Sequence, residues 1–392
     1  MVLDVRRKNT RYHFLISPKA GWVQCSTSFW RGGIVIVMLV LVLSSVLYSS
    51  TSPARRKLIR QAKEAIAGAD PFMGDWQGSW TLDDGTDSGR LVAQVIALGK
   101  GEYRASFFEE FDQRIEPIAR LDGQLRAGQV HFSGPANYNG AELQAKAGIG
   151  QSKLTGSFKG QGSEGQDLAG TVVLESIVRL SPTLGAKPPA GAVVLFDGEN
   201  FDQWQHAKKG SDKVQWSLVD GAMEVKPRSG SIITNRKFTD VKLHLEFRTP
   251  FMPEARGQGR GNSGVYLQGR YEVQILDSYG LEGRDNECGG IYKVAAPRVN
   301  MCAPPMQWQT YDITFRAPRF DSSGKKVKNA YLTVLHNGVT IHENVEVSPK
   351  PTTAAPDSNV TEPGGIYLQD HGNPVQFRNI WLVELPSERV SY

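Results

Sequence analysis

Polar and apolar side chains alternate in the segment YEVQILD, residues 271–277. If this segment is a β-strand, Glu272 and Gln274 project from one face, while Val273 and Ile275 project from the other. With the apolar pair turned toward a core, the polar pair lines the open face of the sheet. A carboxylate placed there can accept or donate a proton. We therefore take Glu272 as the first candidate for a catalytic base or acid, and a structural surface carboxylate is the alternative.

The preceding strand could place Asn262 and Tyr266 beside this polar pair. The spacing Glu-x-Gln-x-x-Asp also resembles the E-x-D-x-x-E strand of laminarinase-like jelly-roll glucanases. Here an amide replaces the middle acid and Asp277 replaces the last one. A double-displacement glycosidase needs two carboxylates at a set spacing, so the amide weakens that mechanism.

Residues 192–386 consist of short β-rich runs separated by turns. In VKLHLEFR, residues 241–248, apolar and polar side chains alternate with the period of a half-buried strand. Its polar members His244, Glu246 and Arg248 could line the same open sheet or lie on the outer one. About a dozen such runs, almost without helical pattern, predict two packed antiparallel sheets. The predicted fold class is all-β, with a jelly-roll sandwich at the C-terminus.

Residues 70–181 form a second β-rich region, which predicts a smaller meander or barrel-like domain. Trp76 near its start and Arg179 near its end resemble the Trp and Arg that stack in lipocalin-type barrels. The region contains no evident catalytic constellation, and we interpret it as a spacer or binding module. Residues 182–191 are a Pro/Gly-rich linker, and residues 387–392 a tail. The eight predicted strands are Trp76–Leu82, Arg90–Leu98, Tyr103–Phe108, Arg114–Leu121, Gln129–Ser133, Glu142–Ala147, Lys153–Phe158 and Thr171–Leu180.

An uncharged apolar run, Ile34–Tyr48, lies near the N-terminus. Basic residues dominate ahead of it, which predicts a cytoplasmic tail over residues 1–31 and a transmembrane anchor over 32–49. A helical stalk is expected over 50–69, since Pro stands near its start and Gly near its end. We expect a single-pass membrane protein whose C-terminal domains are exported to the periplasm or cell surface. Secretion after cleavage of a signal peptide is the alternative.

The net charge of +5 is concentrated in this N-terminal part. Residues 1–64 contain eleven basic side chains against Asp4 and Glu64, whereas the remainder carries 34 basic and 38 acidic groups. The bulk of the chain has no basic surplus to neutralise phosphates, so we expect no nucleic-acid partner.

Cys288 and Cys302 are the cysteines expected on the exported side, with thirteen residues between them. A disulfide across this loop is sterically feasible and an oxidising compartment would allow it, so a bridge and two free thiols are both open. Neither thiol has a CxxC partner or a nearby His, which disfavours a metal site.

Five motifs occur in one order over about residues 192–386 and resemble the 3-keto-disaccharide hydrolase domain family, also described as 3-keto-alpha-glucoside-1,2-lyase/3-keto-2-hydroxy-glucal hydratase. The resemblance implies a concanavalin-like sandwich that acts on oxidised sugars. The motifs are LFDGENFDQW from Leu195, NSGVYLQGRYEVQILDSYG from Asn262, CGGIYKVAAPRVN from Cys288, WQTYDITFRAP from Trp308 and GGIYLQDHGNPVQFRNIWLVEL from Gly364.

The resemblance implies a lyase and hydratase chemistry. A ketone at sugar C3 acidifies the C2 proton, so a base can remove it, the C1 oxygen can leave, and water can add to the enone. Such a site needs a base, an acid and a group that stabilises the enolate. Glu272 is the first candidate for the base or acid. His371 is the next titratable candidate, with a capping role as its alternative, and Lys293 or Tyr292 could stabilise the enolate.

Asn262, Tyr266, Gln274 and Asp277 are suited to hydrogen-bonding sugar hydroxyls, as is Tyr292. No His/Asp/Glu cluster has clear metal spacing, so the metal is unknown, although a divalent cation is one candidate for the enolate stabiliser. A 3-keto-glycoside or another carbohydrate is the expected partner, and a sugar 3-oxidase is a further candidate. The alternatives to this enzyme are a non-catalytic lectin-like module and a jelly-roll glycoside hydrolase.

Overall fold

The computed structural model describes residues 3–8, 11–16, 23–27 and 52–386, apart from positions 151, 209, 212, 349 and 354. The first three ranges are strands β1 (Leu3–Lys8), β2 (Arg11–Ile16) and β3 (Val23–Thr27), which form an antiparallel sheet. The predicted anchor Ile34–Tyr48 lies outside the described residues. Among the helices in the described ranges, none combines the length and apolar content needed to cross a bilayer.

Helix α2 (Pro53–Ala69) confirms the helix predicted over 50–69, and Ile66 from its last turns packs into the core of the next domain. Asp70 fixes the chain as it leaves the helix. One of its carboxylate oxygens accepts hydrogen bonds from the backbone N–H groups of Phe72 and Met73, and the other accepts one from the Tyr103 hydroxyl.

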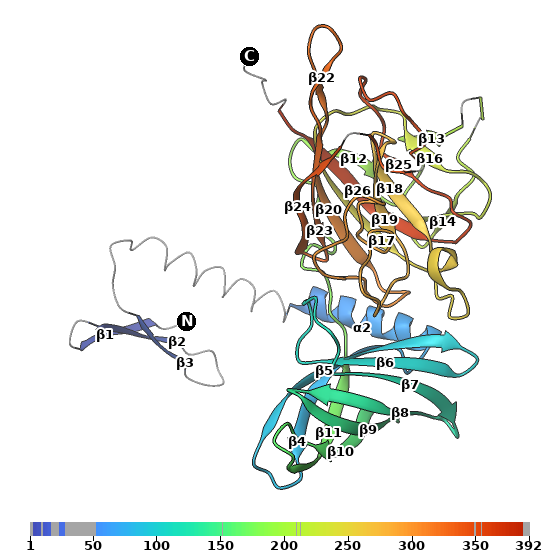
Figure 1. Cartoon of the computed structure of the whole chain (residues 1–392). Helices are drawn as coiled ribbons and strands as arrows, with labels where there is room; N and C mark the ends of the chain where they lie inside the picture. Colours follow the sequence, from blue (N-terminus) through green and yellow to red (C-terminus); the bar gives the residue numbers. More distant parts are fainter. Residues whose placement is uncertain are drawn as a thin grey trace. The chain divides into compact units, whose positions relative to one another are not determined.

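Residues 74–177 form a closed antiparallel barrel in which neighbouring strands follow one another in sequence and the last pairs with the first (Figure 1). This confirms the predicted barrel-like domain. The fourth strand was placed too early, because it begins at Ala119, two residues after Pro117, and not at Arg114. The strands are β4 (Gly74–Leu82), β5 (Ser88–Gly99), β6 (Glu102–Phe108), β7 (Ala119–Arg126), β8 (Gln129–Tyr138), β9 (Ala141–Ile149), β10 (Lys153–Gln161) and β11 (Asp167–Ile177).

Arg179 does not stack on Trp76 as the resemblance to lipocalin-type barrels predicted. Its guanidinium lies 4.0 Å from the centre of the Phe111 ring and pairs with Asp75 at 2.8 Å. Asp75 also accepts a hydrogen bond of 2.7 Å from the hydroxyl of Tyr279. Arg179 therefore serves an ion pair near the start of β4, and the Trp–Arg stacking prediction is wrong.

The C-terminal part, residues 193–384, contains two larger antiparallel sheets and the small pair β21–β22. Sheet 1 has the order β14-β15-β26-β17-β20-β23-β24, with β12 also on β26, and sheet 2 has the order β13-β16-β25-β18-β19. The all-β prediction is confirmed, and the jelly-roll topology stays a prediction. The strands are β12 (Val193–Phe196), β13 (Trp204–His206), β14 (Ser217–Val219), β15 (Ala222–Glu224), β16 (Ile232–Thr234), β17 (Val241–Arg248), β18 (Ser263–Leu267), β19 (Tyr271–Ile275), β20 (Gln309–Arg316), β21 (Arg319–Phe320), β22 (Lys326–Lys328), β23 (Ala330–His336), β24 (Val339–Val347), β25 (Tyr367–Leu368) and β26 (Gln376–Glu384).

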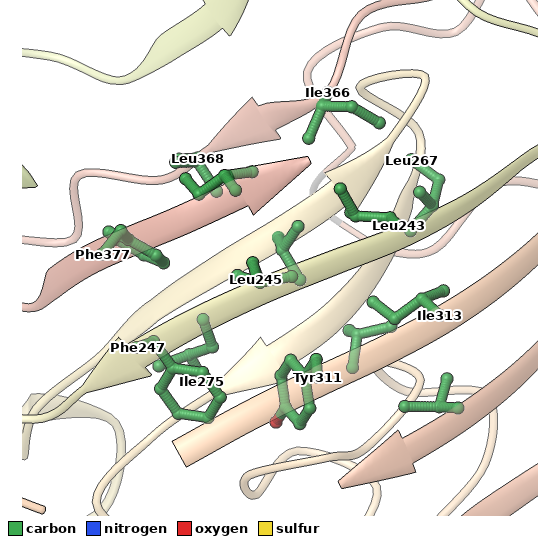
Figure 2. Packing of buried hydrophobic residues seen from close by; sticks show 14 of the residues in the cluster. Leu243, Leu245, Phe247, Leu267, Ile275, Tyr311, Ile313, Ile366, Leu368 and Phe377 are labelled. Carbon is green, nitrogen blue, oxygen red and sulfur yellow. The ribbon is translucent and has the colours of Figure 1, made fainter. Parts of the chain in front are cut away.

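The inner faces of sheets 1 and 2 share one hydrophobic core. Leu243, Leu245 and Phe247 of β17 belong to the same cluster as Leu267 of β18 and Ile275 of β19, and Figure 2 shows these side chains close together. Period-two alternation therefore sends the intervening polar side chains of β17 and β19 to the two outer faces.

The segment between the barrel and β12 packs on the outer face of sheet 1. The backbone N–H of Gly185 donates to Glu246 Oε1 at 2.6 Å, and the Thr183 hydroxyl donates to Asp312 at 2.8 Å. His244 Nδ1 lies 2.8 Å from the same Asp312 carboxylate group. His244 and Glu246 therefore lie on the outer face, away from sheet 2, and each is 1% exposed.

Candidate active site

Glu272 lies on β19, the edge strand of sheet 2, directly opposite Tyr266 of β18. Its neighbours Val273 and Ile275 point into the shared core, as the alternation predicts. The predicted open face is wrong, because Glu272 is only 2% exposed and Gln274 only 1%. On this face, Gln274 Nε2 donates a hydrogen bond to Gln258, which lies in the segment before β18. At the free edge of β19, the Thr352 hydroxyl accepts a hydrogen bond of 3.0 Å from the backbone nitrogen of Glu272.

Gly264 on β18 makes room for the Glu272 carboxylate. A Cβ at this position would lie 2.4 Å from Glu272 Oε1 and 3.0 Å from the Tyr266 ring. Any larger residue would have to displace the carboxylate, since such approaches are far below van der Waals contact. Gly264 therefore determines where the acid group lies.

Burial raises the pKa of Glu272 to about 8, against an ordinary value of 4.5, and a hydrogen bond with Tyr266 opposes this rise. Removal from water penalises the charged form, and the single phenolic partner compensates for only part of that cost. At neutral pH Glu272 is protonated in most molecules. Where its carboxylate forms, it is a stronger base than the carboxylate of an ordinary glutamate. A group with this pKa can both donate and accept protons near neutrality.

Two tyrosines, Tyr266 and Tyr367, act on this carboxyl group. Burial raises the pKa of Tyr266 far above its ordinary range, and the charge of Glu272 adds to the effect. The Tyr266 ring meets Tyr367 of β25 edge-on, with the ring centres 5.1 Å apart. Burial also raises the pKa of Tyr367, with a further contribution from Glu272. Gln369 donates from Nε2 to the Tyr266 hydroxyl at 3.1 Å.

Tyr367, Gln369 and Thr352 are parts of this site that the sequence analysis missed. The alternation in GGIYLQ, residues 364–369, could have revealed two of them. Ile366 and Leu368 belong to the core, so Tyr367 and Gln369 must face the same side as Glu272. Thr352 lies in a loop without period-two alternation, and its spacing gave no signal.

The structure brings some of the predicted candidates to Glu272 and leaves others apart. The backbone N–H of Tyr292 donates to the Glu272 carbonyl at 3.1 Å, and its side chain is half-buried. Lys293 is exposed and lies 3.6 Å from Asp285, with which it forms an ion pair. His371 is exposed in the loop after β25. Within the part of the chain that the structure describes, neither Lys293 nor His371 forms a hydrogen bond or ion pair with the Glu272 carboxyl group.

Asn262 and Gln274 meet at Gln258, beside the tyrosine cluster. Asn262 Nδ2 donates to Gln258 Oε1 at 3.1 Å, and Gln274 Nε2 donates to the same oxygen at 3.0 Å. The backbone N–H of Asn262 donates to Asn373 Oδ1 at 2.7 Å, whereas Oδ1 of Asn262 is buried without a hydrogen-bond partner in the structure. A buried carbonyl oxygen of this kind is suited to accept a hydrogen bond from a ligand hydroxyl.

Asp277 forms a buried ion pair with Arg260, with 2.6 Å between Oδ2 and Nε. Burial raises the pKa of Asp277, and the adjacent guanidinium opposes that rise. This carboxylate is therefore occupied by Arg260, which argues for a positioning role in place of the predicted contact with sugar.

Of the two states that the sequence left open, the structure shows free thiols at Cys288 and Cys302. Cys288 Sγ lies 3.2 Å from the Tyr311 hydroxyl, and Cys302 Sγ lies 3.4 Å from the carbonyl of Leu276. Both thiols are buried in the core between the sheets. No group of three or more His, Cys, Asp or Glu side chains suited to a metal ion occurs in the part of the chain that the structure describes.

Together these residues define a site that can transfer protons and hydrogen-bond hydroxyl groups. Residues 191–383 match the family model of the 3-keto-alpha-glucoside-1,2-lyase-like domain. The fold and the family match define this protein as a carbohydrate-active enzyme. Through this C-terminal domain the chain belongs to the 3-keto-alpha-glucoside-1,2-lyase-like domain family, as its motifs predicted.

Two similar solved structures come from Parabacteroides distasonis, and both are described as candidate glycosyl hydrolases. The first, at 2.13 Å resolution, is 36% identical, with a TM-score of 0.46, and the match covers 50% of this chain and 85% of the other. The second, at 1.70 Å resolution, is 20% identical, with a TM-score of 0.38, over 50% of this chain and 94% of the other. A comparison with curated proteins gave no match.

Proposed function

We propose that the C-terminal domain cleaves 3-keto-glycosides by elimination followed by hydration. The observation that carries the proposal is a buried Glu272 whose pKa is raised to about 8, set among tyrosines in a domain of this family. Gln274 supports elimination over double displacement, because it supplies an amide where a retaining glycosidase would need a second carboxylate.

In the first step the Glu272 carboxylate takes the C2 proton of the sugar. The electron pair of the C2–H bond forms the C1=C2 double bond, while the C1–O bond breaks and the aglycone oxygen takes a proton. In the second step water adds its hydroxyl at C1, and a proton returns to C2. The net reaction consumes one water molecule and is a hydrolysis, although no direct displacement occurs at C1.

Enolate stabilisation falls to the phenol groups near Glu272. Tyr367 and Tyr292 are the donors best supported for the developing negative charge at the C3 oxygen, because both lie close enough to the Glu272–Tyr266 pair to interact electrostatically. Lys293 is less suited to this role, since its ammonium group is exposed and paired with Asp285. His371 remains the proposed acid for the leaving group.

The experiment uses the full-length protein and two chromogenic substrates, p-nitrophenyl 3-keto-glucoside and its parent p-nitrophenyl glucoside. Elimination requires the ketone, because only the ketone acidifies the C2 proton. We therefore expect p-nitrophenol release from the keto sugar alone. Equal release from both substrates would replace the proposal with ordinary glycoside hydrolysis, and binding without release would favour the lectin-like alternative.

We further propose that Ile34–Tyr48 anchors the chain in a membrane, with the enzyme domain exported. The support is the uncharged apolar run and the excess of basic residues ahead of it. Deletion of residues 1–52 should release the protein from the membrane fraction. Tight membrane association of that truncated chain would contradict the anchor.

A further inference from the structure

The barrel of β4 to β11 encloses a cavity of about 320 Å³. A barrel of eight strands is wide enough to be filled by side chains or to hold one small ligand. In this barrel, side chains fill one end and leave a cavity at the other. Trp76, near the start of β4, belongs to the packed core, whereas Trp80 and Leu82, near its end, line the cavity. Its volume lies at the lower end of the ~300–1,000 Å³ that small-molecule sites occupy.

The cavity wall is largely apolar and rich in small residues. On β9 the successive inward positions Leu143, Ala145 and Ala147 line it, together with Ala136 of β8. Leu or Val at such positions would fill the space, so the alanines leave it open. An apolar cavity of this size offers water few hydrogen-bond partners and favours an apolar occupant.

Aromatic rings narrow the cavity on one side. The Trp80 ring meets Tyr138 and Phe158 edge-on, with centres 5.6 Å and 6.3 Å apart. Two glycines make room for these rings. A Cβ at Gly89 would lie 2.6 Å from Trp80 Nε1, and one at Gly170 would lie 2.4 Å from the Phe158 ring. Gly89 and Gly170 therefore allow the Trp80 and Phe158 rings to take these positions beside the cavity.

Polar and negatively charged groups gather among the loops around the cavity. Its polar lining includes Asn139, Ser163, Gln166 and the exposed Asp87. Burial raises the pKa of the Tyr138 phenol, and the carboxylates of Glu109 and Asp87 raise it further. Two acidic groups thus act on a residue of the cavity wall, and they would repel a ligand with a negative charge. Lys146, the basic residue among the lining side chains, is exposed on a position that alternates with the inward alanines.

We propose that the barrel binds an uncharged amphiphile, whose alkyl or aromatic body occupies the cavity beside Trp80 and whose hydroxyl or amide group meets the polar residues of the surrounding loops. The negative charge there selects against fatty carboxylates of the same chain length. This binding site is separate from the Glu272 site, so its occupation is not required for glycoside chemistry.

The test is displacement of the neutral fluorophore N-phenyl-1-naphthylamine from the full-length protein by dodecanol and by lauric acid at pH 8. We expect saturable displacement by dodecanol at about tenfold lower concentration than by lauric acid, a difference equivalent to one modest electrostatic contact. Asp87→Asn combined with Glu109→Gln should reduce this difference. Similar displacement by both compounds in the wild type would overturn the proposed selectivity.

Filling the cavity supplies the second arm of the test. Ala145→Phe places a ring in the cavity, and Gln144→Phe on the exposed neighbouring position is the matched control. We expect the first to weaken fluorophore binding at least about tenfold and the second to leave it unchanged. Ala136→Leu, a smaller change, provides the same test if Ala145→Phe unfolds the barrel. Equal binding by the folded filling variants and the control would show that the fluorophore does not occupy the cavity, and would overturn the proposal.

Discussion

Two glutamates of the C-terminal domain are equally buried and have opposite electrostatic surroundings. Glu246 lies on the outer face of sheet 1 and is 1% exposed, and Glu272 lies on the outer face of sheet 2 and is 2% exposed. Burial alone would raise the pKa of both. For Glu246, hydrogen bonds with His244, Asn379 and Gly185 and the charge of Arg378 overcome that effect and lower the pKa to about 2.

No positively charged group contributes to the pKa of Glu272, and burial raises that pKa to about 8. The difference teaches that burial by itself does not identify a functional carboxylate. Glu246 is a compensated structural charge that joins sheet 1 to the segment before β12. Glu272 retains an electrostatic cost that the fold does not remove, and such uncompensated groups are typical of catalytic sites.

The largest expected effect comes from Glu272→Gln. The amide keeps the volume and hydrogen-bonding capacity but cannot accept the C2 proton, so cleavage of the 3-keto-glycoside should fall by roughly a hundredfold or more. Turnover of p-nitrophenyl 3-keto-glucoside measures it. Near wild-type turnover in the folded variant would place the base elsewhere, with His371 next to be tested.

Glu246→Gln makes the same substitution at equal burial and is the matched control. It removes the ion pair with Arg378, whose Nε lies 2.7 Å from Glu246 Oε2, and leaves this guanidinium without that anion, whereas His244 keeps its contact with Asp312. We expect a loss on the order of 3 kcal/mol in the free energy of unfolding. The measurement is denaturant unfolding, with turnover of the folded fraction expected to stay close to wild type. A stable protein with reduced turnover would reverse the roles of the two glutamates.

The pH dependence of stability should carry opposite signs for the two groups. Because folding raises the pKa of Glu272 from 4.5 to about 8, the native state binds the extra proton between these values, and its contribution to stability falls as pH rises. The slope is at most roughly 1.4 kcal/mol per pH unit. Unfolding of wild type and Glu272→Gln from pH 5 to 9 checks this, and we expect the variant to lose the decline.

For Glu246, whose folded pKa is lowered from 4.5 to about 2, the contribution to stability is fully present above 4.5 and disappears as pH falls toward 2. In a plot of the free energy of unfolding against pH, Glu246→Gln should therefore remove the loss of stability below pH 4.5 and leave the decline at higher pH unchanged. An alkaline decline that persists in Glu272→Gln and disappears in Glu246→Gln would contradict the assignment.

The smallest expected effect comes from Tyr266→Phe. The Tyr266 hydroxyl hydrogen-bonds the Glu272 carboxylate and lowers its pKa, so its removal should raise that pKa further. We expect turnover near pH 7 to fall about two- to tenfold, the range for one lost hydrogen bond. The pH–rate profile should also shift to higher pH. An unshifted profile would show that Tyr266 does not act on the Glu272 carboxyl group.

Much of this comparison could be anticipated from the sequence. Alternation placed Val273 and Ile275 in the core and Glu272 on the opposite face, and the motifs identified the family of the C-terminal domain. Alternation could not show that Glu272 is buried, because Tyr367 and Gln369 are distant in sequence and the Thr352 loop at the edge of β19 has no periodic pattern. For the same reason Glu246 could not be assigned to a face until the contact with Gly185 was seen.

The sequence left the state of Cys288 and Cys302 open for a related reason. Loop length and composition allowed Cys288 and Cys302 to meet, but they do not determine whether two buried thiols are bonded to each other or hydrogen-bonded to Tyr311 and the backbone. In the barrel, glycine-rich turns predicted the order of the strands, whereas the cavity depends on which small residues face inward on several strands at once.

The most direct test of the central claim is isotope exchange at C2. A 3-keto-glucoside is converted in D₂O by wild-type protein and by Glu272→Gln, and NMR follows deuterium at C2 of product and remaining substrate, with an enzyme-free sample as the reference. Elimination and hydration through Glu272 predicts enzyme-dependent deuterium at C2 of the product, and little or none with Glu272→Gln. Release of the aglycone with the original C2 hydrogen retained, or undiminished exchange by Glu272→Gln, would contradict the account.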